Sequence, residues 1–264
     1  NRIYNKEIAL KWKFSIFFVL IIMACSAPEG YKRGLYHFER AEYRMAITQL
    51  EAELEKDPQD YDAMILLGRS QAGVGYLRKA QETFSKAKEL DRERWEAYYY
   101  RGNAFALSGD RRRALIDLDK GIQLAPDYGY FYIERSAVKM NMGAAKGAEE
   151  DAKAAMKLLP DDPGGYINMG VILFDQGEYD TALEYTLEAL KKNDKSRRAL
   201  INAGIISEFL KMDDDALNYY TKAIELFPQD PEAYKMRAAL YIDLGEKKKA
   251  IQDSKTANRI IRGG

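Results

Sequence analysis

The chain has 264 residues, and its 41 lysine and arginine side chains equal its 41 aspartate and glutamate side chains, so the formal net charge is zero. Without residues 1–24, basic side chains number 37 and acidic ones 40. A general nucleic-acid-binding surface needs a clear basic excess, so this balance argues against a nucleic-acid partner. The single cysteine, Cys25, excludes an internal disulfide.

The first 24 residues differ in composition from the rest of the chain. Residues 1–13 are polar with a net positive charge, and residues 14–24 form an apolar run of eleven residues that only Ser15 interrupts. Such a run is too short for an ordinary transmembrane helix and has the length of a signal-peptide core. The alternatives are an uncleaved anchor and an apolar helix that caps the domain behind it.

The run ends in Ile22-Met23-Ala24-Cys25, which resembles the lipobox of bacterial lipoproteins, with Met23 a looser fit. The resemblance implies a signal peptide over residues 1–24, lipidation of Cys25 and a short tether at residues 25–26. Acyl chains bind a bilayer by about 0.8 kcal/mol per buried CH₂, so the three chains usual in Gram-negative lipoproteins would anchor the protein permanently. Because Ser26 rather than Asp follows the cysteine, the resemblance favours the outer membrane, at either its periplasmic or its surface face.

From Ala27 onward the sequence repeats every thirty-four residues. We number each unit so that Pro163 is position 1 of its own. The predicted units are residues 27–60, 61–94, 95–128, 129–162, 163–196, 197–230 and 231–264. A period of this length, sustained over seven units, indicates one solenoid rather than separate globular domains.

Three positions of the unit are small throughout. Position 8 reads Gly34, Gly68, Gly102, Ser136, Gly170, Gly204 and Ala238. Position 20 is alanine in all seven units: Ala46, Ala80, Ala114, Ala148, Ala182, Ala216 and Ala250. Position 27 is small from the second unit on, after a larger Glu53 in the first. Small residues at helical spacing let two antiparallel helices approach closely, so each unit is predicted to be a helix, a turn near position 15 and a second helix.

This pattern resembles the tetratricopeptide repeat (TPR), whose period and small residues are a recognised signature. The resemblance covers about nine-tenths of the chain. It implies an all-α fold, a right-handed superhelical solenoid of about seven helix-turn-helix repeats. The sequence departs from the pattern mainly in the first unit, at Gly30 and Glu53, and these departures are expected to weaken that unit.

In TPR architecture the first helices line a concave face. Positions 5, 6 and 9 of the four middle units are therefore predicted to bind a partner protein or an extended peptide. The residues are Tyr99, Tyr100, Asn103, Ile133, Ile167, Asn168, Val171, Ile201, Asn202 and Ile205. Asparagine both donates and accepts hydrogen bonds, which suits a peptide backbone. The alternative is that these residues pack against the next unit or face water.

Other chemistries find little support. Chaperone-binding TPR proteins grip a C-terminal carboxylate with a set of Lys, Asn and Arg side chains, and that set is absent in every register. No phosphate-binding glycine loop, no nucleophile–base arrangement and no metal-ligand cluster stands outside the repeats, and there is only one histidine. We therefore predict no enzymatic activity, no cofactor and no metal.

The sequence thus predicts a TPR scaffold that Cys25 tethers to a bacterial envelope membrane. The architecture is similar to that of lipidated TPR proteins that assist pilus or secretion assembly, and that similarity implies an envelope role. Two alternatives stay open: a self-associating structural protein whose solenoids stack through their ends, and a TPR interaction protein without lipid.

Overall fold

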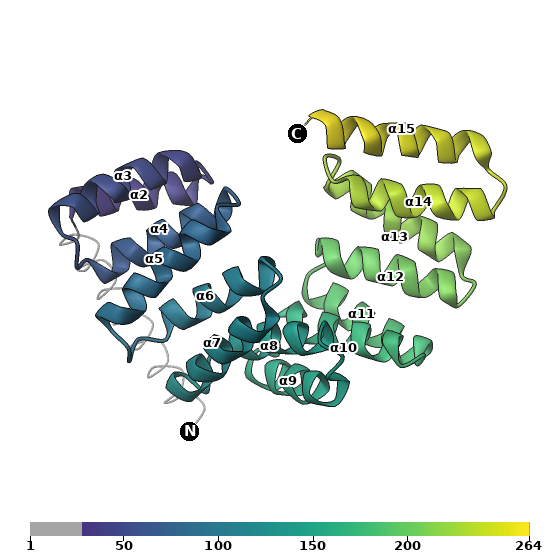
Figure 1. Cartoon of the computed structure of the whole chain (residues 1–264). Helices are drawn as coiled ribbons and strands as arrows, with labels where there is room; N and C mark the ends of the chain where they lie inside the picture. The colour runs from purple at the N-terminus through teal and green to yellow at the C-terminus, as the bar shows by residue number, and fades with distance from the viewer. Residues whose placement is uncertain (1–27, 264) are drawn as a thin grey trace, which may run out of the picture. The chain divides into compact units, whose positions relative to one another are not determined.

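The structure is a computed structural model that describes residues 28–263; Cys25 and the apolar run before it lie outside the described residues. The described residues are helical, and fourteen helices form seven pairs (Figure 1). The first helices of the pairs are α2 (Glu29–Glu39), α4 (Tyr61–Gly73), α6 (Glu96–Leu107), α8 (Tyr130–Met140), α10 (Pro163–Asp175), α12 (Arg197–Phe209) and α14 (Pro231–Asp243). The second helices are α3 (Tyr43–Lys56), α5 (Leu77–Leu90), α7 (Arg111–Leu124), α9 (Ala145–Leu158), α11 (Tyr179–Lys192), α13 (Asp213–Leu226) and α15 (Lys247–Gly263).

The described residues divide into two compact units, one up to Leu124 and one from Ala125 on. Unit 1 contains α2 to α7 and unit 2 contains α8 to α15, and within each unit every helix packs on the one that follows. The all-helical TPR fold that the sequence predicts is therefore confirmed. Among the described residues, no helix combines the length and the apolarity needed to cross a bilayer.

The turn inside each pair forms where the sequence predicts it. In the fifth pair α10 ends at Asp175 and α11 begins at Tyr179, with Gly177 between them at a φ of +83°. Glycine adopts this left-handed conformation without steric cost. Ala41 and Lys211 occupy the same position 15 in other pairs at φ values of 57° and 61°, where a side chain costs energy.

The small positions bring the two helices of a pair together as expected. All seven alanines at position 20 are buried. The five glycines at position 8 lie against the side chain at position 24 of the second helix, which is Leu50, Phe84, Leu118, Thr186 or Tyr220. Gly204 faces the fully buried ring of Tyr220, whereas Ser136 faces the backbone of α9 near the small Ala152 and donates a hydrogen bond to the Ala148 carbonyl. Glycine at position 8 thus leaves room for side chains as large as tyrosine at position 24.

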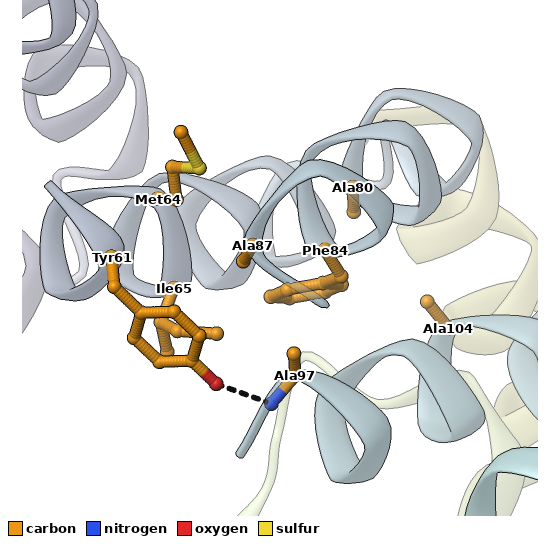
Figure 2. Packing of buried hydrophobic residues seen from close by; sticks show 8 residues of the cluster. All are labelled: Tyr61, Met64, Ile65, Ala80, Phe84, Ala87, Ala97 and Ala104. Atoms are coloured by element: carbon orange, nitrogen blue, oxygen red, sulfur yellow. Dashed lines mark hydrogen bonds between the residues drawn. The ribbon is translucent and has the colours of Figure 1, made fainter. Parts of the chain in front are cut away.

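Figure 2 shows the core at the junction of the second and third pairs in unit 1. The ring of Phe84 fills the space between α4 and α6, and Ala87 and Ala97 let the helices approach. The Tyr61 hydroxyl accepts a hydrogen bond of 3.1 Å from the Ala97 amide. Burial raises the pKa of Tyr61 to about 12, so this hydroxyl stays protonated over the physiological range.

The tyrosines at position 4 have a second role in addition to packing. The hydroxyls of Tyr98, Tyr132 and Tyr166 donate to the main-chain carbonyls of Arg92, Pro126 and Pro160, which hold position 32 of the preceding repeat. These bonds tie the start of a first helix to the turn before it. The core member of residues 130–132 is Phe131, which is fully buried, while Tyr132 stays half-exposed so that its hydroxyl reaches the turn.

Buried ion pairs recur inside three repeats and were not predicted from the sequence. Arg101, Arg135 and Arg237 at position 7 each pair through two nitrogens with the aspartate at position 23 of the same repeat, Asp117, Asp151 and Asp253. Their N···O distances are 2.6–3.0 Å. Arg101 and Arg237 also donate to a hydroxyl of the preceding second helix, Ser85 and Thr221. Arg101 and Arg237 therefore join neighbouring repeats as well as the two helices of one repeat.

The two departures in the first repeat compensate each other. Glu53 at position 27 is buried, and its Oε2 atom accepts a hydrogen bond of 3.2 Å from the Gly30 amide at position 4. A side chain at residue 30 would collide with that carboxylate. The large residue thus fills the space that the glycine leaves, so the pattern is altered at both positions but the contact is kept.

Candidate peptide-binding surface

The predicted binding surface lies on the first helices, and the structure divides its ten residues by burial. Four are buried, with exposed fractions of 8% or less: Ile133, Ile167, Asn168 and Ile201. Six are half-buried: Tyr99, Tyr100, Asn103, Val171, Asn202 and Ile205. Only the second group presents side-chain surface that a partner can reach without local unfolding.

Asn168 is a structural residue of unit 2. Its exposed fraction is 0%, and its Nδ2 donates a hydrogen bond of 2.8 Å to the Ile133 carbonyl on α8. Its Oδ1 accepts from Arg198 Nη2 on α12 at 3.4 Å. One amide therefore joins three consecutive repeats. The alternative interpretation of the sequence, packing between repeats, describes Asn168 better than an open position on the groove.

The isoleucines at position 5 follow the same alternative. Ile167 belongs to a cluster with Ala189 and Ala199, and Ile201 to a cluster with Leu200 and Ala223. The first cluster joins α10, α11 and α12, and the second joins α12 to α13. These side chains hold the repeats together and contribute little surface to a partner.

What remains accessible in unit 2 is a mixed strip on α8, α10 and α12. It contains Val171, Asn202 and Ile205, together with Glu134 and Arg198. Burial raises the pKa of the Glu134 carboxyl, and the charge of Arg198 opposes that shift only in part. A half-buried acid beside an exposed base suits a partner with polar main-chain groups more than a purely apolar one.

Unit 1 contains a more sharply defined feature, which we call the Arg69 pocket. It is a cavity of about 210 Å³ on α2, α4 and α6, closed by side chains of α3 and α5. The lining residues are Phe38, Tyr43, Arg69, Ala72, Phe84, Tyr100, Asn103, Ala104 and Leu107. The predicted residues Tyr100 and Asn103 are thus brought together, whereas Tyr99 is not part of the lining.

Aromatic rings form the walls of the pocket. Tyr100 stacks on the buried Phe84 with ring centroids 5.8 Å apart, and Phe38 meets Tyr43 edge to face at 5.6 Å. The Arg69 guanidinium contacts both walls, 4.5 Å from the Phe38 centroid and 4.9 Å from the Tyr100 centroid. Such contacts hold a cation in place without neutralising it.

Asn103 adds a polar group to this apolar site. Its Oδ1 atom is buried and accepts no hydrogen bond within residues 28–263. A buried carbonyl oxygen without a donor costs about 1–3 kcal/mol, which a ligand that supplies a donor would recover once a small rotation of the Asn103 side chain brings the oxygen to the pocket surface. The pocket therefore combines aromatic walls, one cation and one amide whose hydrogen bonding is incomplete.

The sequence prediction missed Arg69, Phe38 and Leu107. Arg69 occupies position 9 of the second repeat, the position that Asn103 holds in the third, so extending the same alignment by one repeat would have identified it. Phe38 and Leu107 lie at positions 12 and 13, near the ends of their helices. The predicted residues come from positions 5, 6 and 9 of the four middle repeats and therefore include neither of them.

Within residues 28–263 no group of three His, Cys, Asp or Glu side chains is placed to hold a metal ion. His37 is bound to Glu42 through Nδ1 and Oε2 at 2.7 Å. Together, the repeated helix pairs and their open side-chain strips define a class, the helical repeat proteins that act by binding other chains.

Comparison with known proteins gives the family. A sequence profile described as "Tetratricopeptide repeat" matches residues 38–233, and a second one with the same description matches residues 219–252. The chain therefore belongs to the tetratricopeptide repeat family. Members of this family are non-enzymatic scaffolds for protein–protein interaction, and they bind protein or peptide partners.

Individual relatives share the fold at low identity. The human "Superkiller complex protein 3" is 34% identical over 62 residues, which is 24% of this chain and 4% of that protein. The structure of the APC/C hetero-tetramer Cut9-Hcn1 matches with a TM-score of 0.75 and 20% identity, over 86% of this chain and 45% of that one. Pseudomonas aeruginosa pilF matches with a TM-score of 0.63 and 16% identity, over 80% and 95%. At these identities the two structures show the fold alone.

Proposed function

We propose that the chain is a lipid-anchored adaptor of the bacterial envelope. Cys25 carries the lipid, the outer membrane is the site of attachment, and the first helices hold partner proteins near that membrane. The lone cysteine directly after an eleven-residue apolar run supports the anchor. The Arg69 pocket, which three consecutive first helices line and in which Arg69 and Asn103 have unused hydrogen-bonding capacity, is the observation that best supports binding through this surface.

The anchor is tested by expressing the full chain in a Gram-negative host with labelled palmitate. Wild type should incorporate label and sediment with membranes, whereas Cys25→Ser should do neither. Ser26→Ala is the matched control and should behave as wild type. If the Cys25→Ser variant stays in the membrane fraction without label, the apolar run rather than a lipid anchors the chain. In an enteric host, Ser26→Asp should move the protein from the outer to the inner membrane fraction.

Binding through the first helices is tested by affinity capture from solubilised envelope with the full chain in mild detergent. The variant Val171→Ser/Asn202→Ala alters two half-buried residues of unit 2, and circular dichroism checks its fold. The control Arg112→Ser/Lys248→Ser alters exposed residues of second helices. A partner lost only with the first variant supports the proposal, and a partner that both variants retain contradicts it.

The same experiment addresses self-association. If this chain itself is the main species captured, and sedimentation of the purified chain depends on concentration, the structural alternative replaces the adaptor. A peptide-binding adaptor should sediment as a monomer until ligand is added.

A further inference from the structure

Arg69 differs from the other partly buried arginines of the first helices. Arg101, Arg135 and Arg237 are each neutralised by an aspartate of their own repeat. Arg69 is also half-buried, yet within the described residues no hydrogen bond or ion pair satisfies its guanidinium. A guanidinium has five N–H donors arranged to hold a carboxylate through two bonds. Its nearest contacts are the two aromatic rings, which leave that capacity unused.

The rest of the pocket indicates which second group of a ligand it can hold. A volume of about 210 Å³ suits a single large side chain, because pockets for whole small molecules begin near 300 Å³. Phe38, Tyr100 and Leu107 supply an apolar and largely aromatic wall, and aromatic rings pack best against other rings. Leu107 is 71% exposed, which is high for a leucine and leaves it free to cover a bound side chain.

We infer that the Arg69 pocket binds an extended acidic–aromatic segment of a partner protein. The carboxylate of an Asp or Glu pairs with Arg69, the aromatic side chain two residues away enters between Phe38, Tyr100 and Leu107, and the segment's main chain bonds to the Asn103 amide. The two-residue spacing follows because alternate side chains of an extended chain point to the same side. This inference rests on the proposed function, since it names the ligand chemistry of that same surface.

Charge also bears on which segment can bind. Residues 1–24 of this chain carry four basic side chains and one acidic one, so they do not match an unpaired cation. The carboxylate is placed within the segment because the pocket extends to both sides of Arg69 on α4, to Phe38 on α2 and to Tyr100 and Leu107 on α6, so the ligand needs chain on both sides of the acid. Probes with blocked ends remove terminal charges and so test this point directly.

The probes are fluorescent nonapeptides with acetylated and amidated ends and a serine/alanine background. Two peptides carry Asp-Ser-Trp and Trp-Ser-Asp at their centres, because the direction in which the peptide chain binds is also tested. Matched controls carry Asn-Ser-Trp, Asp-Ser-Ala or Lys-Ser-Trp. Binding to the full chain in mild detergent is measured by fluorescence anisotropy at low and at high salt. At least one acidic–aromatic peptide should bind roughly tenfold or more tightly than its Asn and Ala controls.

Protein variants locate the binding. Arg69→Gln should weaken the best peptide by roughly 10- to 100-fold, and Arg69→Lys should recover only part of that loss because it keeps the charge without the fork. Arg44→Gln removes an equal charge from an exposed position of α3 outside the pocket and should leave binding unchanged. Leu107→Glu should weaken the aromatic contact. In an Arg69→Glu variant the preference should reverse, so that the Lys-Ser-Trp peptide binds better than the Asp-Ser-Trp peptide.

The outcomes separate this inference from the proposed function. Equal binding of the acidic, amide and basic peptides, or an equal effect of Arg44→Gln and Arg69→Gln, would overturn the ligand assignment. Tighter binding of a peptide with a free C-terminus than of its amidated form would contradict the assignment of the carboxylate to a side chain within the segment. If a captured envelope partner is lost with the unit 2 variant but retained by Arg69→Gln, the adaptor stands and the pocket assignment fails.

Discussion

Gly204 at position 8 lies against Tyr220 at position 24. The effect of a substitution at residue 204 on stability should therefore depend on which residue stands at position 220. A methyl group added at residue 204 would lie 2.7 Å from the Cδ1 and Cζ atoms of the Tyr220 ring, which is fully buried and has no room to move. Overpacking of this kind costs about 1–3 kcal/mol. Alanine instead of glycine inside a helix gains about 1 kcal/mol. Gly204→Ala should therefore be neutral at best and destabilise by up to about 2 kcal/mol.

In a Tyr220→Ser background the ring is absent and only the gain in helix propensity remains. There Gly204→Ala should stabilise by about 1 kcal/mol, so the same substitution reverses its sign. The resulting combination, alanine at position 8 and serine at position 24, is the one that the last repeat carries as Ala238 and Ser254. The free energy that couples the two sites should equal the removed clash, about 1–3 kcal/mol.

The assay is a double-mutant cycle followed by urea unfolding and by hydrogen exchange. Exchange of the α12 and α13 amides is needed because repeat arrays do not always unfold in one transition. Gly102→Ala is the matched control, because a Cβ atom added at residue 102 would lie 3.2 Å from its nearest neighbour, Leu118 Cγ, and would require a shift of only a few tenths of an ångström. An equal effect of Gly204→Ala in both backgrounds would refute the explanation based on size complementarity.

Three further predictions concern local energetics. Lys211→Gly should stabilise by about 1 kcal/mol, and Gly177→Ala should destabilise by about as much, because both residues have positive φ; urea unfolding measures both. Asp151→Ala should lower the free energy of unfolding by about 3–5 kcal/mol in thermal or urea unfolding, because it removes the buried carboxylate that pairs with the partly buried Arg135 and with Lys139. Burial raises the pKa of Glu134, so the folded protein holds this proton more tightly than the unfolded chain does. The free energy of unfolding should therefore fall as the pH rises from about 4.3, the ordinary pKa of glutamate. Glu134→Gln should remove this dependence of stability on pH.

The fold was predictable because it depends on residues that repeat. Seven alanines at one position require close helix crossing in every unit, and the structure buries all of them. The compensation between Gly30 and Glu53 was not predictable from position-by-position reading, because each residue departs from the pattern and only their contact explains both. The Arg and Asp side chains at positions 7 and 23 were readable in principle, since the same pair recurs three times at a spacing of sixteen residues.

How far the predicted binding residues are buried could not be predicted from the sequence, for a physical reason. A helix in a stacked array has neighbours on both sides, so positions 5 and 6 face the adjacent repeat as much as the open side. Whether such a residue is buried depends on the size of its neighbour's side chains. Asn168 is buried by Arg198 and Ile133, whereas Asn202 at the same position of the next repeat stays half-exposed.

The residues that bind a specific partner should therefore be sought where a repeat breaks its own rule without an internal compensation. Glu53 breaks the rule at position 27 and is compensated by Gly30 inside the repeat. Arg69 is the only charged residue at position 9, where the other repeats carry Leu, Asn, Ala, Val, Ile and Ala, and nothing within residues 28–263 compensates its charge. A half-buried cation without a counter-charge destabilises the folded state. A partner carboxylate is the simplest group that would turn this cost into binding energy.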